Sequence, residues 1–392
     1  ALKGEELVNI PPDENEAFLG FVFKVMIDPY VGKLSFVKVF SGRLKSDQLI
    51  HNITQDESER VGSFRQMMGK ENNEIKEIIL GDIIAIPKLE STTAGDTLGI
   101  KGSHLQFRKI QFPKPVYSVA VMPKSRADED KLGNAISRML KEDRTISFDK
   151  NPETGDDVLS GMGDMHIDIV LAKIKERYKV ELETRTPKVP YRETIRKKAT
   201  GQGKHKKQSG GRGQYGDVWF ELSPLEKNAG IEFIDRVVGG VVPKNYIPAA
   251  EKGLREAAQK GYLAGFPATD FACAIYDGSY HEVDSSEMAF KIAASLAFKK
   301  CMETAMPILI EPIMNVEVTV PEECLGDVMG DFNSRRGRIM GIDGEGKLQV
   351  VKAQCPLSEL FRYAIILRSM TSGRGTFFME HSHYEEVPAD VS

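Results

Sequence analysis

The segment Pro115-Val-Tyr-Ser-Val-Ala-Val-Met-Pro123 opens a stretch whose pattern decides the fold of much of this chain. Alternating β-branched and small residues between two prolines predict a strand. The apolar residues that follow recur at i, i+3, i+4, i+7 and i+8, which is typical of an amphipathic helix. They are Leu132, Ala135, Ile136, Met139 and Leu140. A hairpin over 145–149 and 157–160, a second helix and a closing strand come next. Residues 108–186 are therefore predicted to form a ferredoxin-like β-α-β-β-α-β module.

The segment Pro312-Ile-Met-Asn-Val-Glu-Val-Thr-Val-Pro321 repeats this strand pattern near the other end of the chain. A helical stripe and then a hairpin over 338–342 and 347–353 follow it. A second helix over 357–369 and a last strand complete the same order, which predicts a second ferredoxin-like module over 308–392. Two unrelated α+β units are the alternative, because alternating valines after a proline are a common strand pattern.

Residues 1–107 have an all-β character. Five short segments rich in β-branched or aromatic residues are separated by glycines at turn positions. They are 18–26, 34–41, 48–53, 59–67 and 83–88. Short strands with regular turn signals predict a small β-barrel.

Residues 187–307 form a third kind of module, in which strands and helices are mixed. Its predicted elements are strands at 218–222 and 271–277 and helices at 248–260 and 287–302. The longer helix is apolar nearly all round, which predicts that it is buried. Asp284 followed by Glu287 resembles a capping box at the start of this helix.

Composition limits the class of protein. The chain has 392 residues and a net charge of −4, which predicts roughly two to four domains and excludes a wholly basic nucleic-acid coat. The sequence shows neither a run of about 18 apolar residues nor a leader, so neither a membrane span nor a secretion signal is predicted. The cysteines form no C-x-x-C pair, which predicts buried reduced thiols in a cytoplasmic protein. They are Cys273, Cys301, Cys324 and Cys355.

A guanine-nucleotide site is not predicted within this chain. A P-loop requires G-x-x-x-x-G-K-[ST], because backbone amides bind the phosphates and the hydroxyl holds Mg²⁺. The Gly-Lys pairs at 32, 69, 203 and 346 are followed by neither Ser nor Thr, and no Asn-Lys-x-Asp occurs. Asp327-Val-Met-Gly330 fits D-x-x-G but lies inside a helical stripe. We therefore expect no cofactor, neither GTP nor Mg²⁺, in these residues.

Residues 194–216 are strongly basic and contain no acid. The cations are Arg196, Lys197, Lys198, Lys204, Lys206, Lys207 and Arg212. In a chain of negative net charge, such clustering predicts an electrostatic contact with RNA phosphates. A disordered linker would have a similar composition and is the alternative.

Within this stretch, Gly211-Arg-Gly-Gln-Tyr-Gly216 matches G-x-G-x-x-G. A dinucleotide site would need a strand before it and a helix after it, whereas a polar lysine-rich stretch precedes it and a strand follows. Two interpretations stay open. The segment is a flexible hairpin tip, or it is a loop whose glycines let the backbone lie close against RNA. Tyr215 and His205 would then add stacking.

A second unusual loop is Tyr276-Asp-Gly-Ser-Tyr-His-Glu-Val-Asp-Ser-Ser286. His281 beside Glu282 and Asp284 suggests acid–base chemistry or a metal, but one histidine with such neighbours has no recognised ligand spacing. We therefore predict neither a catalytic residue nor a metal ligand here. An exposed polar tip, with Asp284 capping the next helix, is the better interpretation.

Ser334-Arg-Arg-Gly-Arg338 is a short basic turn between a predicted helix and a predicted strand. Cations suit the carboxyl end of a helix, where they oppose the macrodipole. Contact with RNA by Arg335, Arg336 and Arg338 is the second interpretation.

Taken together, these segments resemble the elongation factor G family over almost the whole chain. Long motifs in the family's order carry the resemblance, and each is specific. They are Asp28-Pro-Tyr-Val-Gly-Lys-Leu-Ser-Phe, Ser160-Gly-Met-Gly-Asp-Met-His-Ile, Gln208-Ser-Gly-Gly-Arg-Gly-Gln-Tyr-Gly216, Asp277-Gly-Ser-Tyr-His-Glu-Val-Asp-Ser-Ser-Glu287 and Gly330-Asp-Phe-Asn-Ser-Arg-Arg-Gly-Arg.

The resemblance implies a barrel (1–107), a ferredoxin-like module (108–186), an α+β tip domain of the ribosomal-protein-S5-like type (187–307) and a second ferredoxin-like module (308–392). It implies a monomer that binds both ribosomal subunits, ribosomal RNA and the tRNA–mRNA complex during translocation. The family's GTPase domain, which precedes the barrel, would hold GTP and Mg²⁺.

The tip residues implied to contact RNA come from the two unusual loops. They are Ser209, Gly210, Gly211, Arg212, Gly213, Gln214, Tyr215, Gly216, Ser279, Tyr280, His281 and Asp284. Residues matching Gln214 and His281 touch the tRNA–mRNA duplex in the family. The basic footprint around the loops is expected from Lys204, Lys206, Lys207 and the three arginines of the 334–338 turn.

Two departures from the family's housekeeping pattern leave the specialised role open. Lys204-His-Lys-Lys-Gln208 and Asp217-Val-Trp-Phe look more like elongation-factor-G-like paralogues. The alternative function is a ribosome-associated factor for protection, recycling or regulation that has no GTPase of its own. A P-loop encoded upstream would separate the two.

Overall fold

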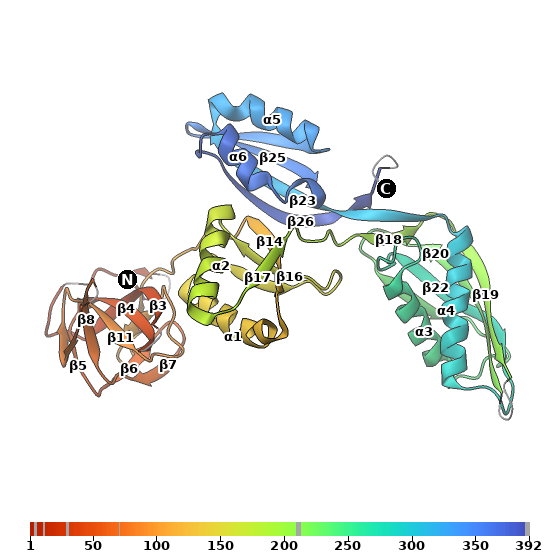
Figure 1. The fold of residues 1–392 in the computed structure, drawn as a ribbon, viewed down its shortest axis with the longest axis horizontal. Coiled ribbons are helices and arrows are strands. Elements are labelled where there is room, and N and C mark those ends of the chain that lie inside the picture. The colour runs from red at the N-terminus through yellow and green to blue at the C-terminus, as the bar shows by residue number, and fades with distance from the viewer. Residues whose placement is uncertain (4–5, 11, 29–30, 70, 209–212, 389–392) are drawn as a thin grey trace. The chain divides into compact units, whose positions relative to one another are not determined.

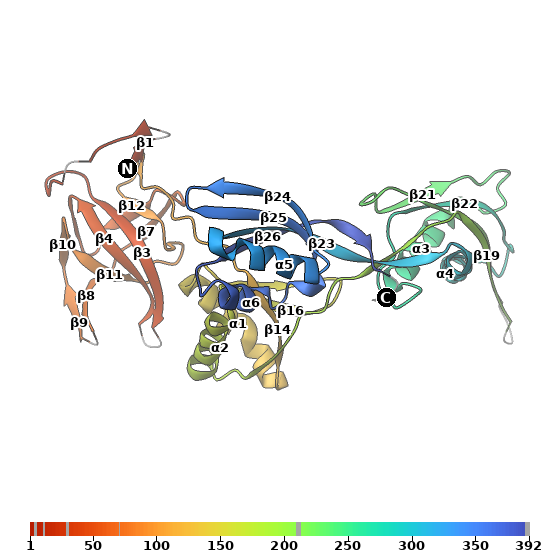
Figure 2. The same ribbon diagram turned by 90° about the horizontal axis from the view of Figure 1, so that it is seen from above.

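The computed structural model describes residues 1–392 except 4–5, 11, 29–30, 70, 209–212 and 389–392. It divides into two compact units (Figure 1, Figure 2). The first unit comprises Ala1–Lys150 and Asp157–Thr186, and the second comprises Asn151–Asp156 and Pro187–Ser392. Each unit contains two separate hydrophobic clusters. The chain is therefore multidomain, β-rich and α+β, as predicted; the four predicted boundaries stay predictions.

The first unit begins with an eight-stranded antiparallel sheet in the order β7-β6-β12-β3-β4-β11-β8-β9. Its strands are β3 (Leu19–Asp28), β4 (Gly32–Ser41), β6 (Leu49–Asn52), β7 (Glu57–Arg60), β8 (Phe64–Met68), β9 (Glu71–Ile75), β11 (Ile83–Pro87) and β12 (Thr97–Gly99). The short strands β1 (Leu2–Lys3), β2 (Glu6–Leu7), β5 (Arg43–Lys45), β10 (Glu77–Ile79) and β13 (Leu105–Gln106) form two small sheets beside it. Alternate side chains such as Val22, Val37 and Phe64 are fully buried, which confirms the all-β prediction.

The second part of this unit has the predicted β-α-β-β-α-β order. The sheet runs β15-β16-β14-β17, which is the ferredoxin-like arrangement. Its elements are β14 (Tyr117–Pro123), α1 (Arg126–Glu142), β15 (Ser147–Lys150), β16 (Asp157–Gly161), α2 (Asp164–Tyr178) and β17 (Leu182–Arg185). Helix α1 begins after Ser125, whose side chain accepts a hydrogen bond from the amide of Asp128.

In the second unit, residues 308–386 repeat this order. Its elements are β23 (Pro307–Pro321), α5 (Leu325–Ser334), β24 (Arg338–Glu345), β25 (Leu348–Pro356), α6 (Tyr363–Met370) and β26 (Thr376–Glu386). The helix predicted over 357–369 is wrong in its first half. A 3₁₀ turn, Leu357–Glu359, precedes α6, and i→i+3 bonds continue this turn as Leu360 and Tyr363 enter the core.

The module between them is a four-stranded sheet, β19-β20-β22-β21, with two helices. Its elements are β19 (Ala199–Lys207), β20 (Gln214–Pro224), β21 (Ile231–Asp235), α3 (Ile247–Lys260), β22 (Phe271–Ser279) and α4 (Glu287–Thr304). The predicted strands and helices are confirmed. Much of the basic stretch, which the sequence suggested to be a loop or linker, is instead the regular strand β19.

Glycines explain why strand β19 was not predicted from the sequence. Gly201, Gly203 and Gly216 lie where β19 and β20 meet α4, and a Cβ on any of them would collide with backbone atoms of that helix. The buried residues of β19 are Ala199, Gly201 and Gly203, so the strand shows no alternation of large apolar side chains that a pattern could detect. The backbone of α4 packs directly on the hairpin as a result.

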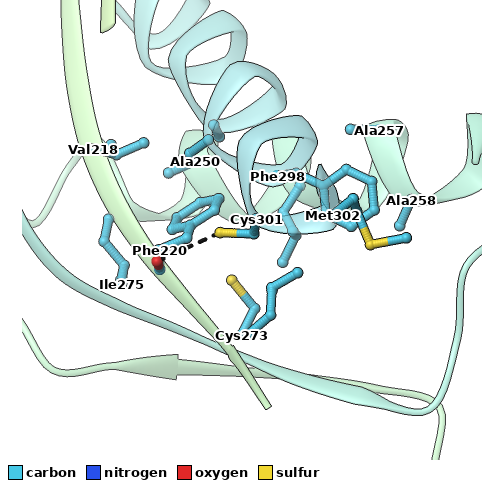
Figure 3. Packing of buried hydrophobic residues seen from close by; sticks show 14 of the residues in the cluster. Val218, Phe220, Ala250, Ala257, Ala258, Cys273, Ile275, Phe298, Cys301 and Met302 are labelled. Carbon is cyan, nitrogen blue, oxygen red and sulfur yellow. Dashed lines mark hydrogen bonds between the residues drawn. The ribbon is translucent and has the colours of Figure 1, made fainter. Parts of the chain in front are cut away.

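Figure 3 shows the core beneath the hairpin. Cys301, Phe298 and Met302 of α4 meet Phe220 of β20 and Cys273 of β22, and the Cys301 thiol donates to the Phe220 carbonyl at 3.5 Å. All four cysteines are free and buried, as predicted.

Two details of α4 differ from expectation. Ser286 caps the helix, accepting from the amide of Ala289, so the capping box that starts at Asp284 is wrong. Met288 and Leu296 are 60% and 38% exposed, so the helix is not buried all round. Among the described residues, none of the helices has the length and apolar character needed to cross a membrane.

Candidate nucleic-acid interface

The β19–β20 hairpin projects the basic stretch away from the core. Its strands pair in register from Ala199 and Leu222 as far as Lys207 and Gln214. The tip residues Ser209, Gly210, Gly211 and Arg212 lie outside the described residues. The structure therefore describes the two strands that lead to and from the tip, as far as Lys207 on β19 and from Gln214 on β20.

The cations of the hairpin fall into two groups. Near its base, Lys198 pairs with Glu221 at 2.9 Å and Arg196 pairs with Glu386. Near its end, lysines 204, 206 and 207 are exposed, and no ion pair joins them to any described residue. Among the described cations of this stretch that have no ion pair to a described residue, three lie at the far end of the hairpin and one, Lys197, lies at its base.

The second unusual loop is hydrogen-bonded to the first. The amide of Tyr215 donates to the Asp284 carbonyl at 2.8 Å, and the amide of Gly213 donates to the Asp284 carboxylate at 3.0 Å. Tyr215 and Ser285 also form an isolated parallel β-bridge. Asp284 does not cap the helix but holds the two loops together, and its predicted contact with RNA stays a prediction.

His281 is 56% exposed at its side chain. Its amide donates to the Ser285 hydroxyl at 2.9 Å, and its Nδ1 accepts from the amides of Val283 and Asp284 at 3.3 Å each. With Nδ1 used as an acceptor, the neutral ring carries its proton on Nε2. Within the described ranges, no group of three His, Cys, Asp or Glu residues is placed to hold a metal.

The remaining tip side chains are held in pairs. His205 Nε2 and Gln214 Oε1 are 2.9 Å apart across the hairpin. The ammonium of Lys204 lies 5.6 Å from the centre of the Tyr215 ring, a cation–π distance. Tyr280 is 47% exposed. Gln214, Tyr280 and His281 are exposed, and with the partly exposed Tyr215 they form a mixed polar and aromatic surface.

Two predicted contacts are directed inward instead. Gly216 is buried against Ala289 and Phe290 of α4, so its glycine serves helix packing rather than an external backbone contact. The Ser279 hydroxyl bonds to Tyr215 and to Asp217. Sequence reasoning missed Asp217 as a tip residue, although a carboxylate within an apolar strand is the signal that would have found it.

The 334–338 turn also needs correction. Arg335 binds the Asp331 carboxylate at 2.6 Å, and Arg336 binds Glu311 at 2.5 Å and Glu359 at 3.3 Å. The hydrogen bond to Glu311, a residue that is 1% exposed, raises the pKa of Arg336. These two guanidinium groups neutralise internal carboxylates, which leaves Arg338 as the exposed cation of the turn.

Four family models match consecutive parts of the chain. They are Elongation factor G domain 2 at 17–100, Elongation Factor G, domain III at 112–186, Elongation factor G, domain IV at 187–306 and Elongation factor G C-terminus at 308–392. Domains of these kinds, in this order, place the chain among translation elongation factors. The chain belongs to the elongation factor G family.

A crystal structure of a protein from Thermus thermophilus is similar to this chain. The two sequences are 43% identical and the TM-score is 0.83. The match covers 96% of this chain and 56% of the Thermus protein. This chain therefore spans little more than half the length of that protein.

Proposed function

We propose that this chain is the ribosome-binding part of an elongation-factor-G-like GTPase that promotes translocation of tRNA and mRNA. The observation that supports it most is the group of exposed lysines at the end of the β19–β20 hairpin, beside the polar loop around His281. Exposed lysines without carboxylate partners suit phosphate oxygens, and stacked or polar side chains suit base and ribose edges.

The tip acts by positioning and not by bond chemistry. His281 uses Nδ1 for local backbone hydrogen bonds, and Asp284 is occupied by Gly213. Gln214 and the Nε2 side of His281 are the groups that we assign to the tRNA–mRNA duplex. Contacts of this kind hold a duplex in place while it moves.

GTP and Mg²⁺ belong, in this proposal, to a GTPase domain of the parent protein and not to this chain, which has no P-loop motif. The ribosome, through both subunits, its RNA and the tRNA–mRNA complex, is the proposed partner of a cytoplasmic monomer. Titration of this chain with labelled GTP is expected to show no saturable binding. Micromolar affinity would overturn this part of the proposal.

The electrostatic part is tested by ribosome binding at several salt concentrations. Changing Lys204, Lys206 and Lys207 together to Ala should weaken binding and reduce the slope of log K against log salt by about 2–3, because each phosphate contact contributes about 0.7–0.9. The matched control changes Lys252, Lys299 and Lys300, exposed lysines of the helices in the same module. Equal slopes for the two triple variants would refute the lysine footprint.

The translocation part is tested in the intact parent protein. Gln214→Ala and His281→Ala each remove one or two hydrogen bonds, worth roughly 0.5–3 kcal/mol. Initial ribosome binding should barely change, because distributed charge dominates it. Single-turnover translocation should slow while GTP hydrolysis stays near normal. If both rates fall together, or neither changes, these residues have no specific role at the duplex.

A further inference from the structure

A buried carboxylate lies directly behind the tip. Asp217 is 5% exposed, and it pairs with Ser279 in the β20–β22 register. Its Oδ1 accepts from the Gln202 side-chain amide at 2.9 Å and its Oδ2 accepts from the Ser279 hydroxyl at 2.7 Å. Both partners are neutral. A buried charge with only neutral partners is costly, so its position calls for a physical reason.

The chain of hydrogen bonds continues to the tip. The hydroxyls of Ser279 and Tyr215 are 2.7 Å apart. Ser279 has one proton and donates it to Asp217, so the proton between the two hydroxyls comes from Tyr215. The order of donors is therefore fixed, from Tyr215 through Ser279 to Asp217, and the carboxylate sets it.

Tyr215 is the residue on which the tip is assembled. Its amide binds the Asp284 carbonyl, its ring carries the Lys204 ammonium at 5.6 Å, and the His281 ring lies 6.4 Å away between centroids. Lys204 is the register partner of Asp217 across the hairpin, yet no described ion pair joins them. The lysine thus lies over the ring while the carboxylate holds that ring from behind.

We propose that Asp217 is a positioning residue of the tip, which acts through Ser279 to fix the Tyr215 ring near Lys204 and His281. This inference rests on the proposed function for its consequence at the ribosome. Its structural part, that the Asp217–Ser279–Tyr215 chain holds the two loops together, is independent of any partner.

The first experiment uses the free chain and hydrogen-exchange mass spectrometry. Ser279→Ala, Tyr215→Phe and Asp217→Asn should each speed exchange in the peptides over 213–217 and 279–286. Asparagine fits the same space, but its NH2 group takes the place of one of the two accepting oxygens and therefore faces the Gln202 amide or reverses the hydrogen bond with Ser279. The control is Ser223→Ala on the same strand β20, which should leave these peptides unchanged.

The second experiment measures the affinity of the same variants for purified ribosomes. Losing the hydrogen bond that positions the ring also frees the Lys204 ammonium that lies over it, so binding should weaken about 3- to 10-fold, whereas Gln214→Ala and His281→Ala leave that lysine in place. The salt slope should stay that of the wild type for Ser279→Ala and Tyr215→Phe, because no charge is removed. Ser279→Thr restores the hydroxyl and should recover most of the affinity lost in Ser279→Ala. The Ser279→Ala/Tyr215→Phe double variant should bind no more weakly than the worse single variant.

The outcomes separate the two proposals. Unchanged exchange in the tip peptides would overturn the positioning role whatever the ribosome does. The positioning role would also be overturned if the variants exchanged faster but bound ribosomes with wild-type affinity. Fully additive losses of affinity in the double variant would overturn it too. Failure of the wild-type chain itself to bind ribosomes would refute the proposed function, and the exchange data would still decide whether Asp217 holds the loops.

Discussion

Replacing the glycines between the hairpin and α4 tests how closely the two are packed. A Cβ at position 201 would lie 2.9 Å from Ala297 O, Cys301 N and Cys301 Sγ, about 0.5 Å inside ordinary contact at 3.4 Å. A Cβ at Gly203 would lie closer still, against the Ala293 carbonyl and the Ala297 amide. Neither atom can rotate away, because both belong to the backbone of a buried helix. We expect Gly203→Ala to cost about 3 kcal/mol, at the upper end for overpacking, and Gly201→Ala about 1–2 kcal/mol.

Urea unfolding followed by tryptophan fluorescence is the assay. Trp219 is the chain's one tryptophan and lies on β20, next to Val218, the register partner of Gly203. The control is Gly330→Ala in α5, where a Cβ meets no atom within 4 Å. It should stabilise its helix by roughly 0.5–1 kcal/mol and leave the Trp219 midpoint unchanged. A midpoint for Gly203→Ala within error of the wild type would refute the close packing.

Three further predictions concern a buried carboxylate, a half-buried carboxylate and two buried thiols. Glu193, fully buried, accepts backbone hydrogen bonds from residues 262–264 and 266, and Glu193→Gln should lower the free energy of unfolding by about 3 kcal/mol, measured by urea, because an amide group would then face donors. Burial alone would raise the pKa of Asp143, but hydrogen bonds, chiefly from Thr145, lower it overall; its stabilisation is present above the unfolded pKa near 4 and is lost on further acidification, so Asp143→Asn should flatten the acid limb of a melting-temperature profile. Burial raises the pKa of Cys301 and Cys355 to about 12, so neither thiol should react with a disulfide reagent at pH 8 until urea is added.

The spacing of apolar residues in the sequence predicted most of the helices and strands. It did not predict the strand that packs through glycines and not through apolar side chains. Apolar residues recur every 3.6 residues in the helix predicted from Leu132 to Leu140 and every second residue in the valine-rich strands. Each of these elements could therefore be predicted from its own segment of sequence. Strand β19 buries Gly201 and Gly203 instead, and this close approach is visible only once α4 is placed on it. The sequence pattern therefore suggested a loop, with a linker as the alternative, where the structure has a nine-residue strand.

The candidate site shows the same division between local and distant information. The lysines at the hairpin end were predictable, because no acid occurs near them in sequence. The partner of Arg336 was not, because Glu311 lies 25 residues away and is brought to it by the β23 strand. Likewise Asp284 has a capping residue's local pattern, but its carboxylate meets Gly213, 71 residues distant.

The charge along the hairpin depends on such partners from distant parts of the sequence. At the base, Lys198 pairs with Glu221 of β20 and Arg196 pairs with Glu386 of β26, so these two cations contribute little to an external field. At the end, Asp217 is buried opposite Lys204, and its two oxygens accept hydrogen bonds from Gln202 and Ser279. It therefore orders the tip through hydrogen bonds, and no described ion pair joins it to the lysine. The Asp217 carboxylate thus takes part in hydrogen bonds within the module, and the charge of the exposed lysines at the hairpin end is not neutralised by it. Loops that are already held together by hydrogen bonds lose less conformational entropy when a partner binds, so the ordering of the tip and the exposed charge of its lysines both favour binding of phosphate.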